Sequence, residues 1–302
     1  MHFPGEESAP SVQREKSPPT HPRSTDISSV SNDELVRIFC SGPVLYEFGD
    51  TKVVRLSEEL VIKGGPCMTR GEAETQILAA NLGFRVPNVH RVFRHTLPDI
   101  DFPGRSQECW LMIMDFIPGV VLEKLWPTLD QDAQKNIAKQ VAQLIQELQS
   151  TSVSKYGLGP VGGSDGEPWN GPFFTHYGAG PFSTLSDMED WYNHKLDVSI
   201  RLRRLPEDTP RFRFDAVALT HQDIAPRNII IQEGTGQLIL IDWSMGGIYP
   251  VGFEQAALSR QCVGDWDAES VDAVLEFLPQ GHDRLTKLLR KIAYGLTTGA
   301  FL

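Results

Sequence analysis

Residues 219–243 read LTHQDIAPRNIIIQEGTGQLILIDW, and no other part of the sequence carries as much structural information. Short apolar runs predict buried strands here, and a polar side chain stands near the end of each: Asp223, Asn228 and Asp242. The tetrapeptide EGTG separates the last two runs and predicts a hairpin turn. Such a hairpin can bring the three polar side chains to one place.

These residue types suit one kind of chemistry. Carboxylate and amide oxygens are the ligands that Mg²⁺ takes, with waters and phosphate oxygens completing a shell of about six. A carboxylate that does not bind the metal can accept the proton of an attacking hydroxyl. Together they are what phosphoryl transfer requires. The alternative is a structural network, because Asp, Asn and His at strand ends often only cap turns.

A kinase-type site also needs a cation for the nucleotide phosphates and an acid that holds this cation. Lys63 ends the last of three short β-rich runs, and Glu72 and Glu74 open a predicted helix directly after it. The three runs predict an antiparallel meander of Val44–Phe48, Lys52–Leu56 and Leu60–Lys63. The cation and the acid therefore occur in the order that the site requires.

Composition limits the possible partners. Over 302 residues the net charge is −11, with 40% apolar and 22% charged residues. Nucleic acid and anionic membranes require a basic surface, so we expect neither as a partner. No apolar run approaches the roughly 20 residues of a membrane-spanning helix, and no hydrophobic leader opens the sequence, so we expect a cytoplasmic protein.

Four widely spaced cysteines, without a C-x-x-C pair, predict free buried thiols rather than a zinc or redox site. They are Cys40, Cys67, Cys109 and Cys262.

Three segments differ in character along the chain. Residues 1–31 are rich in Pro, Ser and charge and predict a disordered tail. Residues 32–116 predict a small β-rich lobe, and residues 117–302 a larger, mainly helical lobe that contains the hairpin. The cleft between two lobes is the default place for a ligand. The aromatic-rich segment 168–182 either lines a substrate pocket or packs on the helical lobe.

Six motifs, in order, resemble the aminoglycoside phosphotransferase family of the protein-kinase-like fold, especially its fungal-type members. They are VVRLSEELVIKGG, GEAE, VPNVHRV, LMIMDFIPGVVLEKLWPTL, LTHQDIAPRNIII and LILIDWSMGGIYPVGFE. The last two together are highly specific, and the resemblance covers roughly Val44 to Leu302. It implies an α+β, bilobal protein-kinase-like fold with a small β-rich N-lobe, one key helix, and a larger helical C-lobe that carries the catalytic β-hairpin.

The resemblance also implies roles for residues of the C-lobe. Asp223 matches the catalytic base of the family. Asn228 matches the amide ligand of Mg²⁺, and Asp242 matches the carboxylate bound to Mg²⁺. Gln222 stands where the family usually has Gly, next to the base, and we expect this to change the fit of the loop rather than the chemistry.

In the N-lobe, the nucleotide-binding part, Lys63 matches the phosphate-binding lysine. Glu72 matches its ion-pair partner, with Glu74 as the second choice. The adenine-binding hinge matches the main chain of Met114, Asp115 and Phe116. The loop expected over the phosphates, YEFGDTKVV, has a single glycine and no G-x-G-x-x-G motif.

The implied activity is an ATP- and Mg²⁺-dependent transfer of the γ-phosphate to a hydroxyl of a small molecule. The alternative is a non-catalytic, pseudokinase-like binding module, serving for example a fungal secondary-metabolite pathway. Mg²⁺-dependent turnover of ATP distinguishes the two. A protein kinase is disfavoured, because no A-P-E segment follows Asp242. The sequence does not identify the phosphate acceptor.

Overall fold

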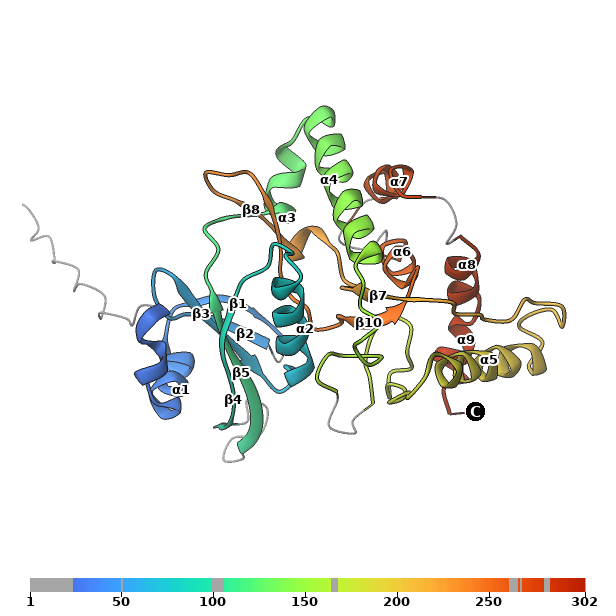
Figure 1. Cartoon of the computed structure of the whole chain (residues 1–302), viewed down its shortest axis with the longest axis horizontal. Helices are drawn as coiled ribbons and strands as arrows, with labels where there is room; N and C mark the ends of the chain where they lie inside the picture. The colour runs from blue at the N-terminus through green and yellow to red at the C-terminus, as the bar shows by residue number, and fades with distance from the viewer. Residues whose placement is uncertain are drawn as a thin grey trace, which may run out of the picture.

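The structure is a computed structural model that describes residues 24–49, 51–98, 106–163, 168–260, 266, 268–279 and 283–301. A mostly β lobe, blue to teal in Figure 1, lies beside a mostly helical lobe that runs from green to red. The chain passes between them after β5, which ends at Asp115, and before β6, which begins at Gly119. The mixed α+β architecture with two lobes is therefore confirmed.

Five antiparallel strands form the N-lobe sheet in the order β1-β2-β3-β5-β4. Their bounds are β1 Val44–Phe48, β2 Thr51–Arg55, β3 Leu60–Gly65, β4 Val89–Pro98 and β5 Ser106–Asp115. The expected meander is present, with its last two strands shifted or extended by one or two residues. β5 pairs with both β3 and β4, so it lies inside the sheet, which explains its long apolar run.

A helix covers each face of this sheet. Alternate side chains of a strand point to opposite faces, so Ile62 of β3 packs toward α1 (Asn32–Ser41) while Val61 packs toward α2 (Arg70–Asn81). The α1 helix is absent from the expected element order. Lys63 shares the face of Val61, so the sheet directs its ammonium group toward α2.

The described structure extends into the segment that the sequence predicts to be a tail. Residues Ser24–Ser29 form a 3-10 helix, and Ser31 caps the N-terminus of α1 by accepting a hydrogen bond from the N–H of Glu34. Ile27 is buried, and its carbonyl accepts a hydrogen bond from Arg91 of β4. These residues belong to the N-lobe because Ile27 contributes to its core. The rest of the expected tail, residues 1–23, lies outside the described residues.

Helices dominate the C-lobe. They are α3 Leu122–Leu125, α4 Gln131–Ser150, α5 Leu185–Arg201, α6 Phe253–Leu258, α7 Ala268–Glu276, α8 Asp283–Lys291 and α9 Ala293–Leu296. Asp130 caps the long helix α4 by accepting a hydrogen bond from the N–H of Ala133. The buried stripe of α4 packs against α7 and the strand β7.

Short strands cross this helical lobe and carry the polar residues of interest. β7 (Val217–Thr220) pairs with β10 (Gly247–Pro250). β8 (Ile229–Gln232) and β9 (Leu238–Leu240) form the expected hairpin, and β6 (Gly119–Val121) extends it to three strands. The 3-10 turn η3, Pro226–Asn228, links β7 to the hairpin.

The aromatic segment 168–182 packs on the helical lobe. Trp169, Phe173 and Phe174 are buried in one cluster with Tyr192 of α5 and Phe253 of α6. The hydroxyl of Tyr192 donates a hydrogen bond to the carbonyl of Phe173 at 2.9 Å. Of the two expected roles, the packing role is observed.

Two of the cysteines differ from expectation. Cys109 is buried, as predicted, whereas Cys40 and Cys67 are exposed. Cys262 lies outside the described residues. No helix among the described residues is both long and apolar enough to cross a membrane.

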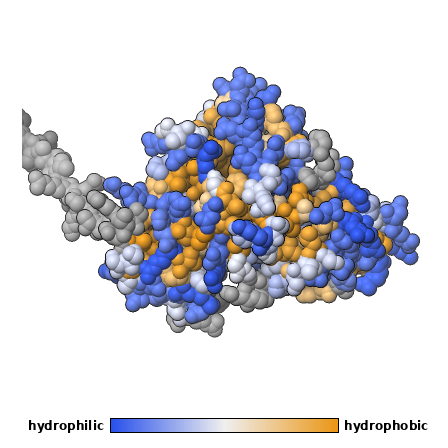
Figure 2. Space-filling view, in the orientation of Figure 1, coloured by the Kyte–Doolittle hydropathy of each residue, from blue (hydrophilic) through white to orange (hydrophobic). Residues whose placement is uncertain are grey.

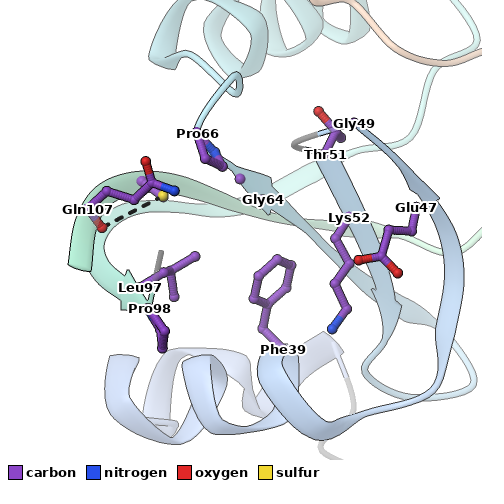
Figure 3. A pocket seen from close by; sticks show the side chains of 12 residues that line it. Phe39, Glu47, Gly49, Thr51, Lys52, Gly64, Pro66, Leu97, Pro98 and Gln107 are labelled. Carbon is purple, nitrogen blue, oxygen red and sulfur yellow. Dashed lines mark hydrogen bonds between the residues drawn. The ribbon is translucent and has the colours of Figure 1, made fainter. Parts of the chain in front are cut away.

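The surface offers one small pocket in the N-lobe, drawn in Figure 3. Phe39 of α1, Lys52 of β2 and Leu97 of β4 line it together with Gln107 of β5. This pocket is on the α1 face of the sheet, opposite Lys63, and is separate from the polar cluster described below. On the face shown in Figure 2, hydrophobic residues reach the surface mainly across the middle, with hydrophilic residues along the upper and right margins.

Candidate active site

Lys63, Glu72 and Asp242 form a buried ionic cluster between the lobes. The Nζ atom of Lys63 lies 2.5 Å from Oε1 of Glu72 and 2.9 Å from Oδ1 of Asp242. The side chains of Lys63 and Glu72 are 6% and 1% exposed, and that of Asp242 is 32% exposed. The expected ion pair is present, and the lysine also contacts Asp242, which follows β9 in the C-lobe.

Electrostatics within this cluster favour its charged form. Burial disfavours the ammonium of Lys63, but the carboxylates of Glu72 and Asp242 outweigh burial and raise the pKa of Lys63. Burial also opposes the charge on Asp242, yet Lys63 lowers the pKa of Asp242 to about 2. Burial raises the pKa of Glu72, against the pull of Lys63. Asp242 therefore stays ionised at neutral pH and is suited to bind a cation.

Glu72 rather than Glu74 is the partner of Lys63. The hydroxyl of Thr69 caps α2 by accepting a hydrogen bond from the N–H of Glu72, so Glu72 occupies the first turn. Glu74 lies two residues later, which turns it to another side of the helix. There its Oε1 is 3.3 Å from Nε of Arg70. Helical periodicity thus separates the two candidates that the sequence left open.

A second cluster surrounds Asp223 on the loop after β7. Asn228 donates from Nδ2 to Oδ2 of Asp223 at 2.8 Å and to its main-chain carbonyl at 2.9 Å. Nη2 of Arg227 lies 2.7 Å from Oδ1 and 2.6 Å from Oδ2 of Asp223. The sequence reading missed Arg227, although its position four residues after Asp223 was a usable signal. Asp223 as a whole is buried.

The hairpin joins the two clusters. Asn228 immediately precedes β8, and its carbonyl accepts a hydrogen bond at 2.9 Å from the N–H of Ile241, the residue before Asp242. Asn228 therefore lies opposite Ile241 in the hairpin, and Asp242 is the next residue along the chain. The structure brings Lys63, Glu72 and Asp242 into contact on one side, and Asp223 with Asn228 on the other.

The donor set suits a hard cation. Because Nδ2 of Asn228 donates to Asp223, its Oδ1 remains as an oxygen ligand, and Asp242 supplies an ionised carboxylate. Oxygen ligands of this kind bind Mg²⁺, which keeps several positions for water and phosphate. No group of three or more His, Cys, Asp or Glu that could hold a metal occurs in the described part of the chain. The residue types of Asn228 and Asp242 thus match those that bind Mg²⁺.

Buried Glu254 fixes the backbone of the Asp223 loop, and the sequence reading missed it. Its carboxylate accepts hydrogen bonds from the N–H of His221 at 2.5 Å and of Gln222 at 3.0 Å. Burial raises the pKa of Glu254 to about 7, although these two N–H groups lower it. The imidazole Nε2 of His221 contacts the carbonyl of Ile241 at 3.0 Å, which ties the loop to the hairpin.

Two residues of the site have left-handed backbone, with φ of 62° at Gln222 and 64° at Asp242. This conformation is strained for residues other than glycine. At Gln222 it explains why glycine suits the position. The side chain of Gln222 donates weakly to Thr220 and Met245, both at 3.3 Å, and its buried Oε1 has no partner among the described residues.

In the expected hinge, some main-chain N–H groups are already used and cannot bind a nucleotide base. The N–H of Asp115 donates to the carbonyl of Asn88, and the N–H of Phe116 donates to the carbonyl of Glu59 at 2.7 Å. Met114 lies inside the ladder, paired with β3 and β4. The first hinge N–H with no partner in the described part of the chain is that of Ile117, one residue beyond the expected stretch.

Strand β1 adds an exposed aromatic surface beside Lys63. Tyr46 is paired with Val53, and Val53 with Lys63, so these side chains share one face of the sheet. Phe48 lies on the same face, two residues further. Tyr46 and Phe48 are 48% and 76% exposed. The loop expected over the phosphates is thus preceded by aromatic side chains on the face of the sheet that carries Lys63. Their common face follows from strand pairing and not from a sequence motif.

Solved structures of aminoglycoside phosphotransferases share this fold. The crystal structure of APH(4)-Ia matches with a TM-score of 0.54 at 16% identity, over 89% of each chain. The streptomycin–ATP ternary complex of APH(2")-IIa matches with a TM-score of 0.51 at 13% identity, over 85% of each chain. The GDP complex of wild-type aminoglycoside 2'-phosphotransferase-IIIa matches with a TM-score of 0.52 at 13% identity, over 86% of this chain and 87% of that chain.

At these identities the likeness establishes the protein-kinase-like fold and no finer property. No curated protein sequence matches the chain. The model of the phosphotransferase enzyme family matches residues 68–288, well over half of the chain. This range contains the hairpin and every residue of the two polar clusters apart from Lys63. The chain therefore belongs to the phosphotransferase enzyme family.

Proposed function

We propose that this phosphotransferase moves the γ-phosphoryl group of ATP, in the presence of Mg²⁺, to a hydroxyl group of a small molecule. The observation that carries the proposal is the pairing of Lys63 with both Glu72 and Asp242 between the lobes, together with the main-chain hydrogen bond that joins Asn228 to the residue before Asp242. A cation, an ionised carboxylate, an amide and a second carboxylate thus lie on adjoining segments, which supports the proposal.

Each residue has a distinct role in the proposal. Lys63 neutralises the phosphates of the nucleotide, and Glu72 holds its ammonium group in place. Asn228 and Asp242 hold the Mg²⁺ ion, which neutralises charge on the phosphates when it is bound. Asp223 orients the acceptor hydroxyl and takes its proton. Glu254 holds the Asp223 loop through two main-chain hydrogen bonds.

The nucleotide base would bind between the lobes. Exposed Tyr46 on the Lys63 face provides an apolar surface on which an adenine ring can stack. The N–H of Ile117 and the carbonyl groups of the hinge offer hydrogen bonds to its edge. Several solved relatives are described as ATP, ADP or GDP complexes, which supports a nucleotide as the donor.

The test is ADP formation by the purified chain with and without Mg²⁺. The acceptors are aminoglycosides, choline-like amines, sugars and hydroxylated metabolites. The proposal requires turnover that disappears when Mg²⁺ is chelated and returns when it is restored. Binding of ATP without turnover of any acceptor or of water would instead favour the non-catalytic binding module.

A further inference from the structure

We propose that Arg227 is a specificity-determining residue and that the natural acceptor has no ammonium group beside its reacting hydroxyl. This inference rests on the proposed function, because it takes Asp223 as the carboxylate that meets the acceptor. It goes further by stating the charge of the substrate class.

Geometry puts a positive charge at the entrance to Asp223. Arg227 lies in η3, four residues after Asp223, and its Nη2 contacts both carboxylate oxygens at 2.7 and 2.6 Å. The side chain of Asp223 is 10% exposed, whereas that of Arg227 is 31% exposed. An acceptor that approaches the carboxylate therefore meets the guanidinium group at the same time.

Nearby carboxylates are already paired with donors. Asp242 faces the ammonium of Lys63 at 2.9 Å. Glu254 is fully buried and accepts the N–H groups of His221 and Gln222. Asp242 thus shares the ammonium of Lys63 with Glu72, and the oxygens of Glu254 are occupied by main-chain N–H groups.

This pattern selects against a cationic acceptor. An ammonium group needs a carboxylate partner to offset its loss of hydration, and it is repelled by a guanidinium held nearby. A neutral or anionic group beside the reacting hydroxyl suffers neither effect. Water screens the partly exposed Arg227, so we expect a preference of about tenfold rather than the larger factor of a dry site.

Acceptors matched in shape but not in charge test the inference. Suitable pairs are choline with 3,3-dimethylbutan-1-ol, glucosamine with N-acetylglucosamine, and kanamycin with its N-acetylated form. The readout is the ratio of kcat/KM, neutral over cationic, from ADP formation by the full chain with Mg²⁺ and ATP. We expect a ratio above one for the wild type, a fall of about tenfold in Arg227→Gln, and a wild-type ratio in Arg227→Lys.

Arg211→Gln is the control, because Arg211 forms an exposed ion pair with Asp197 in the same lobe, 2.5 Å between Nη1 and Oδ1. It should leave both the rate and the ratio unchanged. A purely structural role of Arg227 would lower the rates of both members of a pair equally, and melting temperatures would report any loss of fold.

Four results overturn the inference. A wild-type preference for the cationic members contradicts it, and so does an unchanged ratio in Arg227→Gln. If no acceptor of any pair reacts while ATP is still hydrolysed, with water as the phosphate acceptor, the inference fails but the phosphoryl-transfer site stands. If Mg²⁺–ATP is neither bound nor hydrolysed, the proposed function fails, and the inference fails with it.

Discussion

Replacing Lys63 by Met removes the cation shared by two carboxylates while keeping most of the side-chain volume. Glu72 is 1% exposed, so its charge would be left almost without water or partner. Removing one member of a buried ion pair typically costs about 3–5 kcal/mol. Asp242 is 32% exposed and can recover some hydration, so we expect the lower end, about 3 kcal/mol.

The loss should depend on pH. Burial already raises the pKa of Glu72, and without Lys63 its pKa rises further, because the lysine no longer favours the carboxylate. An acid whose folded pKa lies above its unfolded pKa stabilises the fold at low pH, and this stability is lost as the pH rises through the folded pKa. Lys63→Met should therefore be mildly destabilised near pH 5 and most destabilised above neutrality.

Calorimetric melting of both proteins from about pH 5 to pH 8 measures this effect, and the expected loss at high pH is roughly 6–12 °C. Lys52→Met is the control: Lys52 lies on the neighbouring strand, on the other face, with its Nζ 5.4 Å from the centre of the Phe39 ring. Its replacement should shift the melting temperature only slightly and equally at each pH. The same small, pH-independent shift in Lys63→Met would refute a charged buried cluster.

Three further predictions concern the same lobes. Burial raises the pKa of Glu254 to about 7 from about 4.5, so its contribution to stability is present below pH ~4.5 and is lost, by about 3 kcal/mol, as the pH rises to about 7. Glu254→Gln should therefore flatten the curve of stability against pH over this window, and an unchanged slope would contradict the burial argument. Gln222→Gly should raise the melting temperature, because it relieves a left-handed backbone worth about 1 kcal/mol and removes a buried unpaired oxygen; a lower melting temperature would mean that its two weak hydrogen bonds matter more. Tyr46→Ala should weaken ATP binding about tenfold, as measured by calorimetric titration, with little effect on stability because the side chain is 48% exposed; unchanged affinity would exclude β1 from the nucleotide site.

The sequence was most informative where local pattern and chemistry agreed. The runs VALTH, NIIIQ and LILID, with EGTG between the last two, identified the strands that became β7, β8 and β9. The sequence of α4 likewise shows its own structure, because Asp130 can cap it and its buried residues form an apolar stripe that repeats about every 3.6 residues. These features depend on neighbours in the chain, which the sequence displays directly.

Features set by distant contacts were missed. Residues 24–31 look like a polar tail, yet Ile27 finds a place in the N-lobe core that only the folded sheet provides. Glu254 and the Asp223 loop are more than 30 residues apart, so no local pattern announces their hydrogen bonds. The choice between Glu72 and Glu74 required the position at which Thr69 starts α2.

The hinge shows a third kind of limit. Sequence similarity aligned Met114, Asp115 and Phe116 with the adenine-binding stretch, but the register of β5 with β3 and β4 decides which N–H groups the sheet uses. In this chain the N–H groups of Asp115 and Phe116 are used, and that of Ile117 is left. Register is a property of paired strands, so a single sequence does not specify it to one residue.

Replacement of Asp223 by Asn tests the proposed phosphoryl transfer most directly. The change keeps size and removes only the acceptor charge, although it also weakens the contact with Arg227 and should lower stability slightly. Melting temperature, Mg²⁺–ATP affinity and turnover should be measured on one sample. We expect a folded protein that binds ATP nearly normally and turns over about 10²- to 10⁴-fold more slowly. A folded variant that binds ATP and keeps near-normal turnover would contradict the assignment of Asp223 as the base.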